Sequence, residues 1–140
     1  RPMDEQALTD RIHIRDLLTR YATAVDTRDW DLYRSVFTDD AHIDYTSAGG
    51  IAGGVDEVVD FLDRSLAMFE MTQHLVSNLD IGIDGDSATV KAVFYNPMRL
   101  EGGETWFTGG WYHHDLERTE TGWRSRRLRE ETAWTGRAPF

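Results

Sequence analysis

The order of the elements along the chain constrains its fold most strongly, because helical patterns come first and long strand patterns follow. Residues 71–84, 87–100, 105–118 and 123–134 each alternate in the way of a strand with one buried face. The short connections between them carry Gly beside acidic or Thr residues, which is typical of β-hairpin turns: 84–86 (DGD), 101–104 (EGGE) and 119–122 (TETG). The second half of the chain therefore predicts an antiparallel sheet.

Three helical patterns precede this sheet. In residues 4–25, apolar side chains recur three and four positions apart with charged residues between them, which predicts a long amphipathic helix. A short second helix follows, with Asp29 as its expected N-cap and a pattern that extends to Phe37. Residues 55–69 predict a third amphipathic helix. The apolar positions of the first helix are Leu8, Ile12, Leu17, Leu18, Tyr21 and Val25.

A short strand at residues 41–45 lies between the second and third helices, with Ile43 and Tyr45 on one face. Helices followed by an antiparallel sheet are the pattern of an α+β fold. We expect residues 1–140 to form one domain, a cone-shaped α+β barrel in which three N-terminal helices pack on a curled, mainly antiparallel sheet. Such a cone leaves a hollow at one end, and hollows of this kind hold small ligands.

The charge and the residue types exclude several classes of function. The chain has 25 acidic and 15 basic residues, a formal charge of −10, which works against binding to nucleic acid or to anionic membranes. It has no cysteine, so disulfides, thiolate metal sites and a Cys nucleophile are excluded. His113 and His114 are neighbours on a strand and point to opposite faces, and no HExxH motif occurs, so we expect no metal and no cofactor. With no apolar run of about 18 residues, a cytoplasmic protein is expected.

Asp26 and His74 are the first candidates for chemistry. Asp26 stands where the first helix ends, at the negative end of the helix dipole, where a carboxylate is mildly unfavourable. Its simplest explanation is an Asx-type turn before the second helix. His74 lies within the predicted strand 71–84, where a hydrogen-bonded structural role is the simplest explanation. If a carboxylate such as Asp26 orients the imidazole, the other ring nitrogen is free to move a proton.

Two tyrosines could assist such a dyad. Tyr21 lies on the apolar face of the first helix, and Tyr45 ends the first strand. A phenol in a pocket can donate a hydrogen bond to an oxygen that gains charge during a reaction. The alternative for each is a core aromatic side chain whose hydroxyl is satisfied by the protein.

Several segments together resemble the SnoaL-like branch of the nuclear transport factor 2-like superfamily. The matching strings run along nearly the whole chain: 21–30 (YATAVDTRDW), 37–45 (FTDDAHIDY), 73–78 (QHLVSN), 84–88 (DGDSA) and 122–124 (GWR). This branch includes polyketide cyclases, scytalone dehydratase, bile-acid 7α-dehydratase and a hexachlorocyclohexane dehydrochlorinase. The resemblance implies the same cone and is specific for the fold, but it is weak for the substrate.

The resemblance also implies roles for particular residues. In the dehydratase-like members an Asp and a His form the central dyad, which corresponds to Asp26 and His74, and the substrate-binding tyrosines correspond to Tyr21 and Tyr45. The dehydrochlorinase uses a lysine near the position of Tyr21 and an arginine on its last strand. Tyr21 departs from that pattern, which disfavours dehydrochlorination. The arginine could be any of three that are close together in the last strand: Arg126, Arg127 and Arg129.

By the same resemblance, one face of each of two strands lines the pocket. On strand 105–118 this face would carry Trp106, Tyr112 and His114, although His114 could instead lie at the rim of the cone. On strand 87–100 it would carry Phe94 and Asn96, with Asn96 as the one polar group there. These five residues are the expected substrate-binding wall.

Two classes of function fit these residues. The first is a cofactor-independent lyase or isomerase, of dehydratase or cyclase type, that acts on a small, largely apolar, oxygenated substrate. The second is a non-catalytic module that binds a small ligand or serves as an accessory subunit on the same fold. A related possibility, epoxide hydrolysis, needs more than one carboxylate around a water, and Asp26 is the one inward-facing acid that the sequence indicates.

The outer face of the curled sheet carries Val93, Phe107 and Trp111, which favour a covering partner. We expect a second copy of the chain there, in a homodimer or a homotrimer as in related proteins. The sequence does not choose between the two, and it does not identify the substrate.

Overall fold

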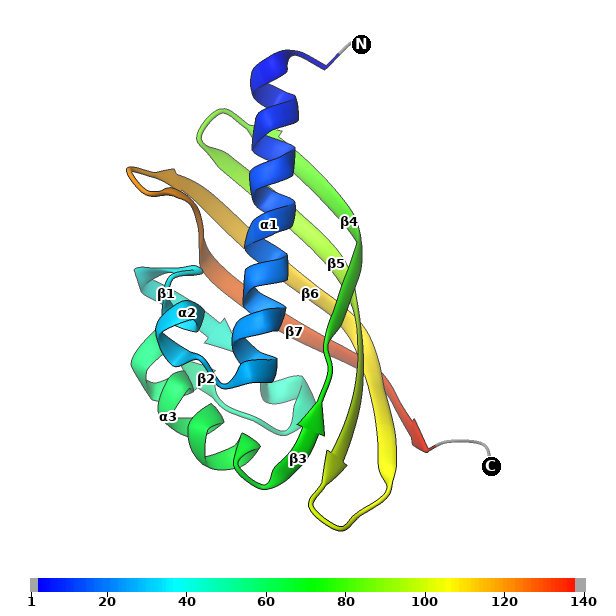
Figure 1. Ribbon diagram of the computed structural model, residues 1–140. Helices are drawn as coiled ribbons and strands as arrows, with labels where there is room; N and C mark the ends of the chain where they lie inside the picture. Colours follow the sequence, from blue (N-terminus) through cyan, green and yellow to red (C-terminus); the bar gives the residue numbers. More distant parts are fainter. Residues whose placement is uncertain (1–2, 138–140) are drawn as a thin grey trace.

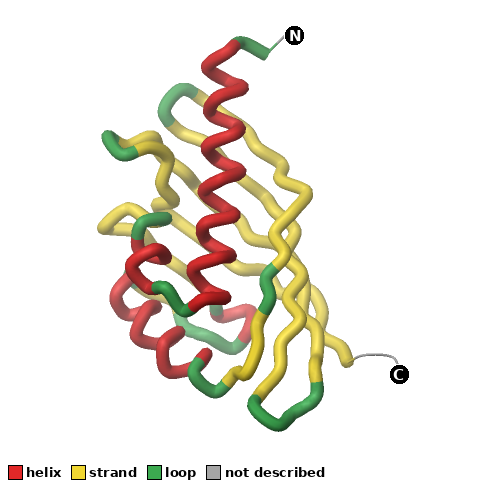
Figure 2. The backbone as a smooth tube through the Cα atoms, viewed as in Figure 1, coloured by secondary structure: helices red, strands yellow, loops and turns green. Residues whose placement is uncertain are grey.

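The computed structural model describes residues 3–137 as a long helix that lies across a strongly curled sheet, with two shorter helices at one end (Figures 1 and 2). The helices are α1 (Glu5–Thr27), α2 (Trp30–Arg34) and α3 (Val55–Leu66). The strands are β1 (Phe37–Asp44), β2 (Ala52–Gly53), β3 (Phe69–Thr72), β4 (Leu75–Asp84), β5 (Ser87–Leu100), β6 (Thr105–Thr119) and β7 (Gly122–Arg137). Within the described residues, no helix is both long enough and apolar enough to cross a bilayer.

The sheet confirms the predicted fold class. Its strands follow the order β2-β1-β7-β6-β5-β3, and β4 pairs with β5 as well. Strands β5, β6 and β7 are antiparallel over nearly their whole length, whereas β1 runs parallel to β7. Because β3 and β4 pair with successive parts of β5, they form one edge of the sheet with a break between them. The result is the expected cone of three helices packed on a curled, mainly antiparallel sheet.

Short polar residues set the ends of the helices. Asp4 caps α1 by accepting a hydrogen bond from the amide of Ala7, and Asp29 caps α2 in the same way through Leu32. Helix α1 ends at Thr27, and the following residue, Arg28, caps it with a left-handed backbone at φ of 59°. The second helix is shorter than predicted, because it stops at Arg34 and the chain then turns into β1.

Two of the apolar residues of α1 lie outside its buried face. Leu17, Leu18 and Tyr21 are buried against the sheet, but Leu8 and Ile12 are about half exposed. Asp10 and Ile14 are buried at the same level of the helix, so by helical spacing Leu8 and Ile12 lie on the opposite, outward face of α1. The prediction that Leu8 and Ile12 face the core is therefore wrong.

A bulge between β6 and β7 changes which side chains of β7 point inward. Gly109 pairs with Trp134 and Gly110 with Thr132, so Ala133 is the extra residue. A Cβ on Gly110 would lie 1.9 Å from the carbonyl oxygen of Glu131, so only glycine fits this close approach. Because the bulge reverses the alternation, Trp134 lies on the outer face, where its ring packs beside that of Tyr95.

The outer face of the sheet is partly apolar. The rings of Tyr95 and Phe107 stack with centroids 5.8 Å apart, and Lys91 lies over the ring of Trp111 at 5.0 Å. Val93, Phe107 and Trp111, which the sequence places on this face, are each half-buried within the single chain.

Candidate active site

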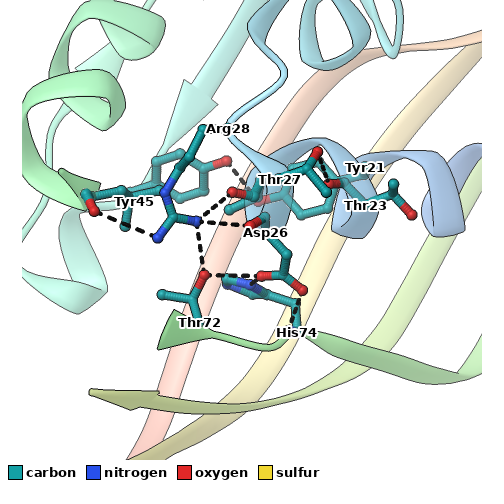
Figure 3. A network of polar contacts seen from close by, with 10 residues as sticks. Tyr21, Thr23, Asp26, Thr27, Arg28, Tyr45, Thr72 and His74 are labelled. Atoms are coloured by element: carbon teal, nitrogen blue, oxygen red, sulfur yellow. Dashed lines mark hydrogen bonds and ion pairs between the residues drawn. The ribbon is translucent and has the colours of Figure 1, made fainter. Parts of the chain in front are cut away.

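Asp26 and His74 are in direct contact. The Nδ1 atom of the His74 ring lies 2.6 Å from Oδ1 of Asp26, and the backbone N–H of His74 donates to Oδ2 at 2.7 Å. The hydroxyl of Thr72 donates to Oδ1 at 3.0 Å (Figure 3). The carboxylate of Asp26 therefore holds the segment 72–74 instead of forming the Asx-type turn that was its simplest explanation.

The C-terminal end of α1 is anchored by Arg28, which fixes Asp26 beside His74. The guanidinium of Arg28 donates to the carbonyl of Val25 at 2.7 Å and to that of Leu66 at 3.4 Å. It also donates to the hydroxyl of Thr72 at 2.9 Å, which links the end of α1 to β3. A cation at the C-terminus of a helix offsets the negative end of the dipole, so it also offsets the cost of a carboxylate at this position.

The sequence predicted that His74 lies within a strand, and this prediction is wrong. His74 occupies the break between β3 and β4, where Gln73 still pairs with the carbonyl of Pro97. The break frees the backbone N–H of His74 from the sheet ladder, and this N–H reaches Asp26 instead. Because Asp26 accepts from Nδ1, the tautomer that fits places the proton on Nδ1 and leaves Nε2 with its lone pair.

Burial and hydrogen bonding shift the pKa of Asp26 in opposite directions. Burial favours the neutral acid, but the hydrogen bonds and the charge of His74, with the Thr72 hydroxyl, outweigh it and hold the pKa of Asp26 below its ordinary value. The side chain of His74 is 9% exposed, and that of Asp26 is 21% exposed. The dyad therefore carries an ionised carboxylate behind a largely enclosed imidazole.

A cavity of about 200 Å³ lies inside the cone, with His74 in its wall. It is smaller than the pockets of roughly 300–1,000 Å³ that hold drug-sized ligands, so it suits a small molecule. Asp26 does not line this cavity, but stands behind His74 beside a separate surface hollow. The other lining side chains that bear on the chemistry are Tyr21, Tyr45, Asn96, Tyr112 and Glu130.

The tyrosines form a chain of hydroxyls. The hydroxyl of Tyr45 lies 2.6 Å from that of Tyr21 and 2.7 Å from that of Tyr33. Burial raises the pKa of all three phenols, so they remain protonated near neutral pH. The structure thus brings Tyr21 and Tyr45 together in the cavity wall, and adds Tyr33, which the sequence did not single out.

Two of the five residues predicted for the wall line the cavity, namely Tyr112 and Asn96. Phe94 stacks on Tyr112 with ring centroids 4.6 Å apart, but it does not line the cavity itself. Trp106 packs on Phe69 and borders a different hollow near the hairpin between β5 and β6. The placement of Phe94 and Trp106 in the cavity lining is therefore wrong.

His114 is neither in the cavity lining nor at the rim. It is buried, 2% exposed, and its Nδ1 atom lies 2.8 Å from the hydroxyl of Ser125. Burial lowers the pKa of His114 to about 3, with the neighbouring charge of His113 acting in the same direction. His114 is therefore a neutral, buried imidazole that is hydrogen-bonded through Nδ1.

Glu130 is the site residue that sequence reasoning missed. It lies directly opposite Tyr112 in the β6–β7 ladder, so both side chains point to the inner face, and Glu130 lines the cavity. Burial raises the pKa of Glu130 to about 7, and the negative charge of Asp44 adds to this rise while the Tyr112 hydroxyl counteracts it. The expectation that Asp26 is the one inward-facing acid is therefore wrong.

The arginines of β7 point away from the cavity. Arg126, Arg127 and Arg129 are exposed, and Arg129 lies 4.0 Å from Glu131 on the outer face. The side chain that takes the inward position is Glu130, two residues after the buried Leu128. That spacing is the signal in the sequence that could have identified it. Within residues 3–137, Tyr21 stands in place of a lysine and no β7 arginine lines the cavity, so the lining lacks the basic groups that the resemblance implies for dehydrochlorination.

Comparison with known proteins places this geometry in a family. Residues 6–129 match the model of the SnoaL-like domain. An uncharacterized protein of Mycobacterium tuberculosis, Rv2910c, is 39% identical over 119 residues, which cover 84% of this chain and 81% of that protein.

Two solved structures share the fold. A protein of Novosphingobium aromaticivorans, provisionally named a scytalone dehydratase, superposes with a TM-score of 0.86 at 19% identity, covering 99% of this chain and 93% of that one. The hexachlorocyclohexane dehydrochlorinase LinA-type3 of Novosphingobium barchaimii gives a TM-score of 0.82 at 20% identity, with coverage of 94% and 92%. At these identities the two structures are similar to this chain in fold alone. The extent of the family match and the identity to Rv2910c show that this chain belongs to the SnoaL-like family.

Proposed function

We propose that the protein is a cofactor-independent lyase or isomerase, of dehydratase or cyclase type, acting on a small, largely apolar, oxygenated substrate. The observation that carries the proposal is the contact of 2.6 Å between His74 and Asp26 at the wall of an aromatic cavity. Members of the family that carry out eliminations share the fold, which supports this class of reaction.

In the proposed reaction, Nε2 of His74 removes a proton from the carbon next to a substrate carbonyl. The carboxylate of Asp26 keeps the ring in the tautomer that exposes this nitrogen, and it stabilises the imidazolium that forms. Tyr21 and Tyr45 donate toward the carbonyl oxygen as it gains negative charge. Loss of a hydroxyl from the next carbon would complete a dehydration, and attack on a second carbonyl would complete a cyclisation.

Epoxide hydrolysis is less well supported, although Glu130 supplies a second inward acid. Both carboxylate oxygens of Asp26 are engaged by His74 and Thr72, and Asp26 lies outside the cavity lining. Among the described residues, the cavity lining therefore holds one carboxyl group, that of Glu130. Epoxide hydrolysis would need more than one carboxylate around the attacking water.

A panel of cyclic β-hydroxyketones tests the proposal through the ultraviolet absorbance of the enone that dehydration forms. We expect turnover by the native protein, and its loss in His74→Ala with the fold retained, as judged by circular dichroism. His42→Ala is the matched control, because His42 is exposed on β1. If the native protein and both variants bind the ketones without turning them over, the result would favour the alternative, a ligand-binding module without catalysis.

A further inference from the structure

We propose that Glu130 is a second catalytic residue of this cavity, the acid that gives its proton to the leaving hydroxyl of a β-hydroxyketone. The inference rests on the proposed function, in which His74 takes the proton from the α carbon. It adds the substrate class, a carbonyl compound with the hydroxyl on the β carbon, and it assigns the second proton transfer that such a dehydration requires.

The position of Glu130 is the first support. Its Oε1 atom is buried and has no hydrogen-bond partner within residues 3–137, although the side chain lines the cavity. A buried polar atom without a partner is costly, so its occurrence in a ligand-sized cavity points to a partner supplied by the ligand. Since Tyr112 is its direct cross-strand neighbour, Glu130 is held on the inner face by the ladder itself.

The charges around Glu130 favour the neutral acid, which is the form that can donate. Three phenols and one carboxylate interact electrostatically with the Glu130 carboxyl group. They are Tyr21 of α1, Tyr33 of α2, Tyr112 of β6 and Asp44 of β1. On its own strand, Arg129 and Glu131 face outward. Within residues 3–137 no cation forms an ion pair with Glu130, and burial brings its pKa to about 7.

The other acids of the cavity are poor alternatives. The lining phenols are Tyr21, Tyr45 and Tyr112, and burial raises the pKa of each, so each gives up a proton reluctantly. These phenols can polarise a carbonyl, but they cannot easily protonate a leaving hydroxyl. Burial brings the pKa of Glu130 to about 7, near neutral pH, where a general acid works best.

His74 and Glu130 also approach the cavity from different walls. His74 precedes β4, which pairs with β5, whereas Glu130 belongs to β7, which pairs with β6. Two strands thus separate them in the sheet, about 14 Å along its curved surface at the usual strand spacing. Because the sheet curls around the cavity, the two side chains converge on it, with a base on one wall and an acid on the other.

The proposed step balances in atoms and charge. Nε2 of His74 takes the α proton, and the electron pair of the C–H bond becomes the new C=C bond. The C–O bond at the β carbon breaks, and its oxygen takes the proton of Glu130 and leaves as water. His74 is then a cation beside Asp26, and Glu130 is an anion, until the proton returns to Glu130 through solvent as the enone leaves.

Two substrates that give the same enone test the assignment. β-Hydroxycyclohexanone needs a proton on its leaving group, whereas β-chlorocyclohexanone loses chloride without one. We expect Glu130→Gln to lower kcat for the hydroxy compound by about 100-fold or more, the usual contribution of a general acid. Turnover of the chloro compound, corrected for its spontaneous elimination, should change less than about threefold, because loss of chloride does not use the proton of Glu130.

Glu131→Gln is the matched control, because Glu131 is the next residue along β7 and pairs with His113 on the outer face at 2.7 Å. It should leave both reactions unchanged. In the native protein, kcat for the hydroxy compound should also fall as the pH rises through about 7, since Glu130 then loses the proton that it must donate. The chloro compound should lack this decrease.

Exchange of the α protons of cyclohexanone in D₂O separates failure of this assignment from failure of the proposed function. Glu130→Gln should keep the exchange, and His74→Gln should abolish it. The assignment of Glu130 is overturned if Glu130→Gln dehydrates the hydroxy compound as fast as the native protein, or if it slows both eliminations equally. It is also overturned if the native protein exchanges α protons but does not dehydrate. If the native protein does neither, the proposed function itself is wrong.

Discussion

His74 and Asp26 are joined twice, through the ring Nδ1 of His74 and through its backbone N–H, to the two oxygens of one carboxylate. The two contacts fix both the position of the main chain at residue 74 and the rotation of the imidazole. The dyad is therefore built by the break between β3 and β4, which releases this backbone N–H from the sheet.

Replacement of Asp26 by Asn separates these two contacts. The amide oxygen can still accept from one donor of residue 74, but the neutral side chain no longer stabilises an imidazolium or selects the tautomer with Nε2 free. We expect kcat to fall by about 10²–10⁴-fold with little change in KM, in line with the loss of an orienting carboxylate. Asp16→Asn, on the exposed face of α1, is the control. A variant Asp26→Asn with native kcat would show that the carboxylate does not serve His74.

Thr72 tunes the acid of the dyad. Its hydroxyl donates to Asp26, and hydrogen bonds to a carboxylate lower its pKa. We expect Thr72→Val to raise the pKa of Asp26, so that activity is lost at a higher pH as the solution is made acidic. Carbon NMR of the Asp26 carboxyl and the acid limb of the pH–rate profile measure this shift. Thr89→Val, at an exposed position of β5, should leave both unchanged, and an unshifted profile in Thr72→Val would contradict the role of the hydroxyl.

The hydroxyl chain predicts different results for two tyrosines. Tyr45 lies between Tyr21 and Tyr33 and lines the cavity, whereas Tyr33 does not. Tyr45→Phe should lower kcat about tenfold or more, because it removes a hydroxyl that donates toward the substrate carbonyl. Tyr33→Phe should cost about 1 kcal/mol in the free energy of unfolding, the usual value of one hydrogen bond, with a smaller effect on kcat. Equal kinetic effects of the two changes would argue against a role for Tyr45 at the substrate.

The far end of the cone holds a partly buried ion pair that should contribute to acid stability. Asp10 is 2% exposed and accepts two hydrogen bonds from Arg118, at 2.8 and 2.9 Å, and one from the indole of Trp123. Asp10→Asn should lower the free energy of unfolding by about 1.5–3 kcal/mol, the usual value of hydrogen bonds to a charged group, because Arg118 keeps Asp86 as a second partner. Urea denaturation near neutral pH measures this, with the exposed Asp60→Asn as the control.

The sign of the pH effect follows from the pKa of Asp10. The hydrogen bonds from Arg118 hold this pKa well below its ordinary value, despite the opposing effect of burial. A depressed pKa in the folded state stabilises the protein above the unfolded pKa of about 4, and this stability is lost as the pH falls further. The native protein should therefore lose more stability between neutral pH and about pH 3 than Asp10→Asn does. Parallel losses would show that Asp10 is not ionised in the fold.

The sequence predicted the fold well because its signals are local. Helix caps such as Asp29, the hairpin turns and the alternation of β5 depend on neighbouring residues, and the ends of β5 agree with the prediction. The break at His74 could not be predicted in this way, because alternation continues through it. Contacts to residues distant in the sequence cause the break, namely Gln73 with Pro97 and His74 with Asp26.

Glu130 was missed for a related reason. Its inward orientation depends on the register of β7, which is shifted at two points along the β6–β7 ladder, beside Gly110 and beside Leu116. A bulge inserts one residue and reverses the alternation, so counting from either end of the strand gives different faces. Tyr21 and Tyr33 of the hydroxyl chain, in contrast, lie on regular helices, and the position of Tyr21 on the buried face of α1 follows from helical spacing.

The most direct test of the central claim is the rate of α-proton exchange of cyclohexanone in D₂O, followed by NMR, for the native protein and for His74→Gln. Removal of a general base typically costs about 10²–10⁴ in rate, so we predict exchange by the native protein and a loss of this size in the variant, with the ketone still bound. Exchange at the native rate without the imidazole of His74 would contradict the account.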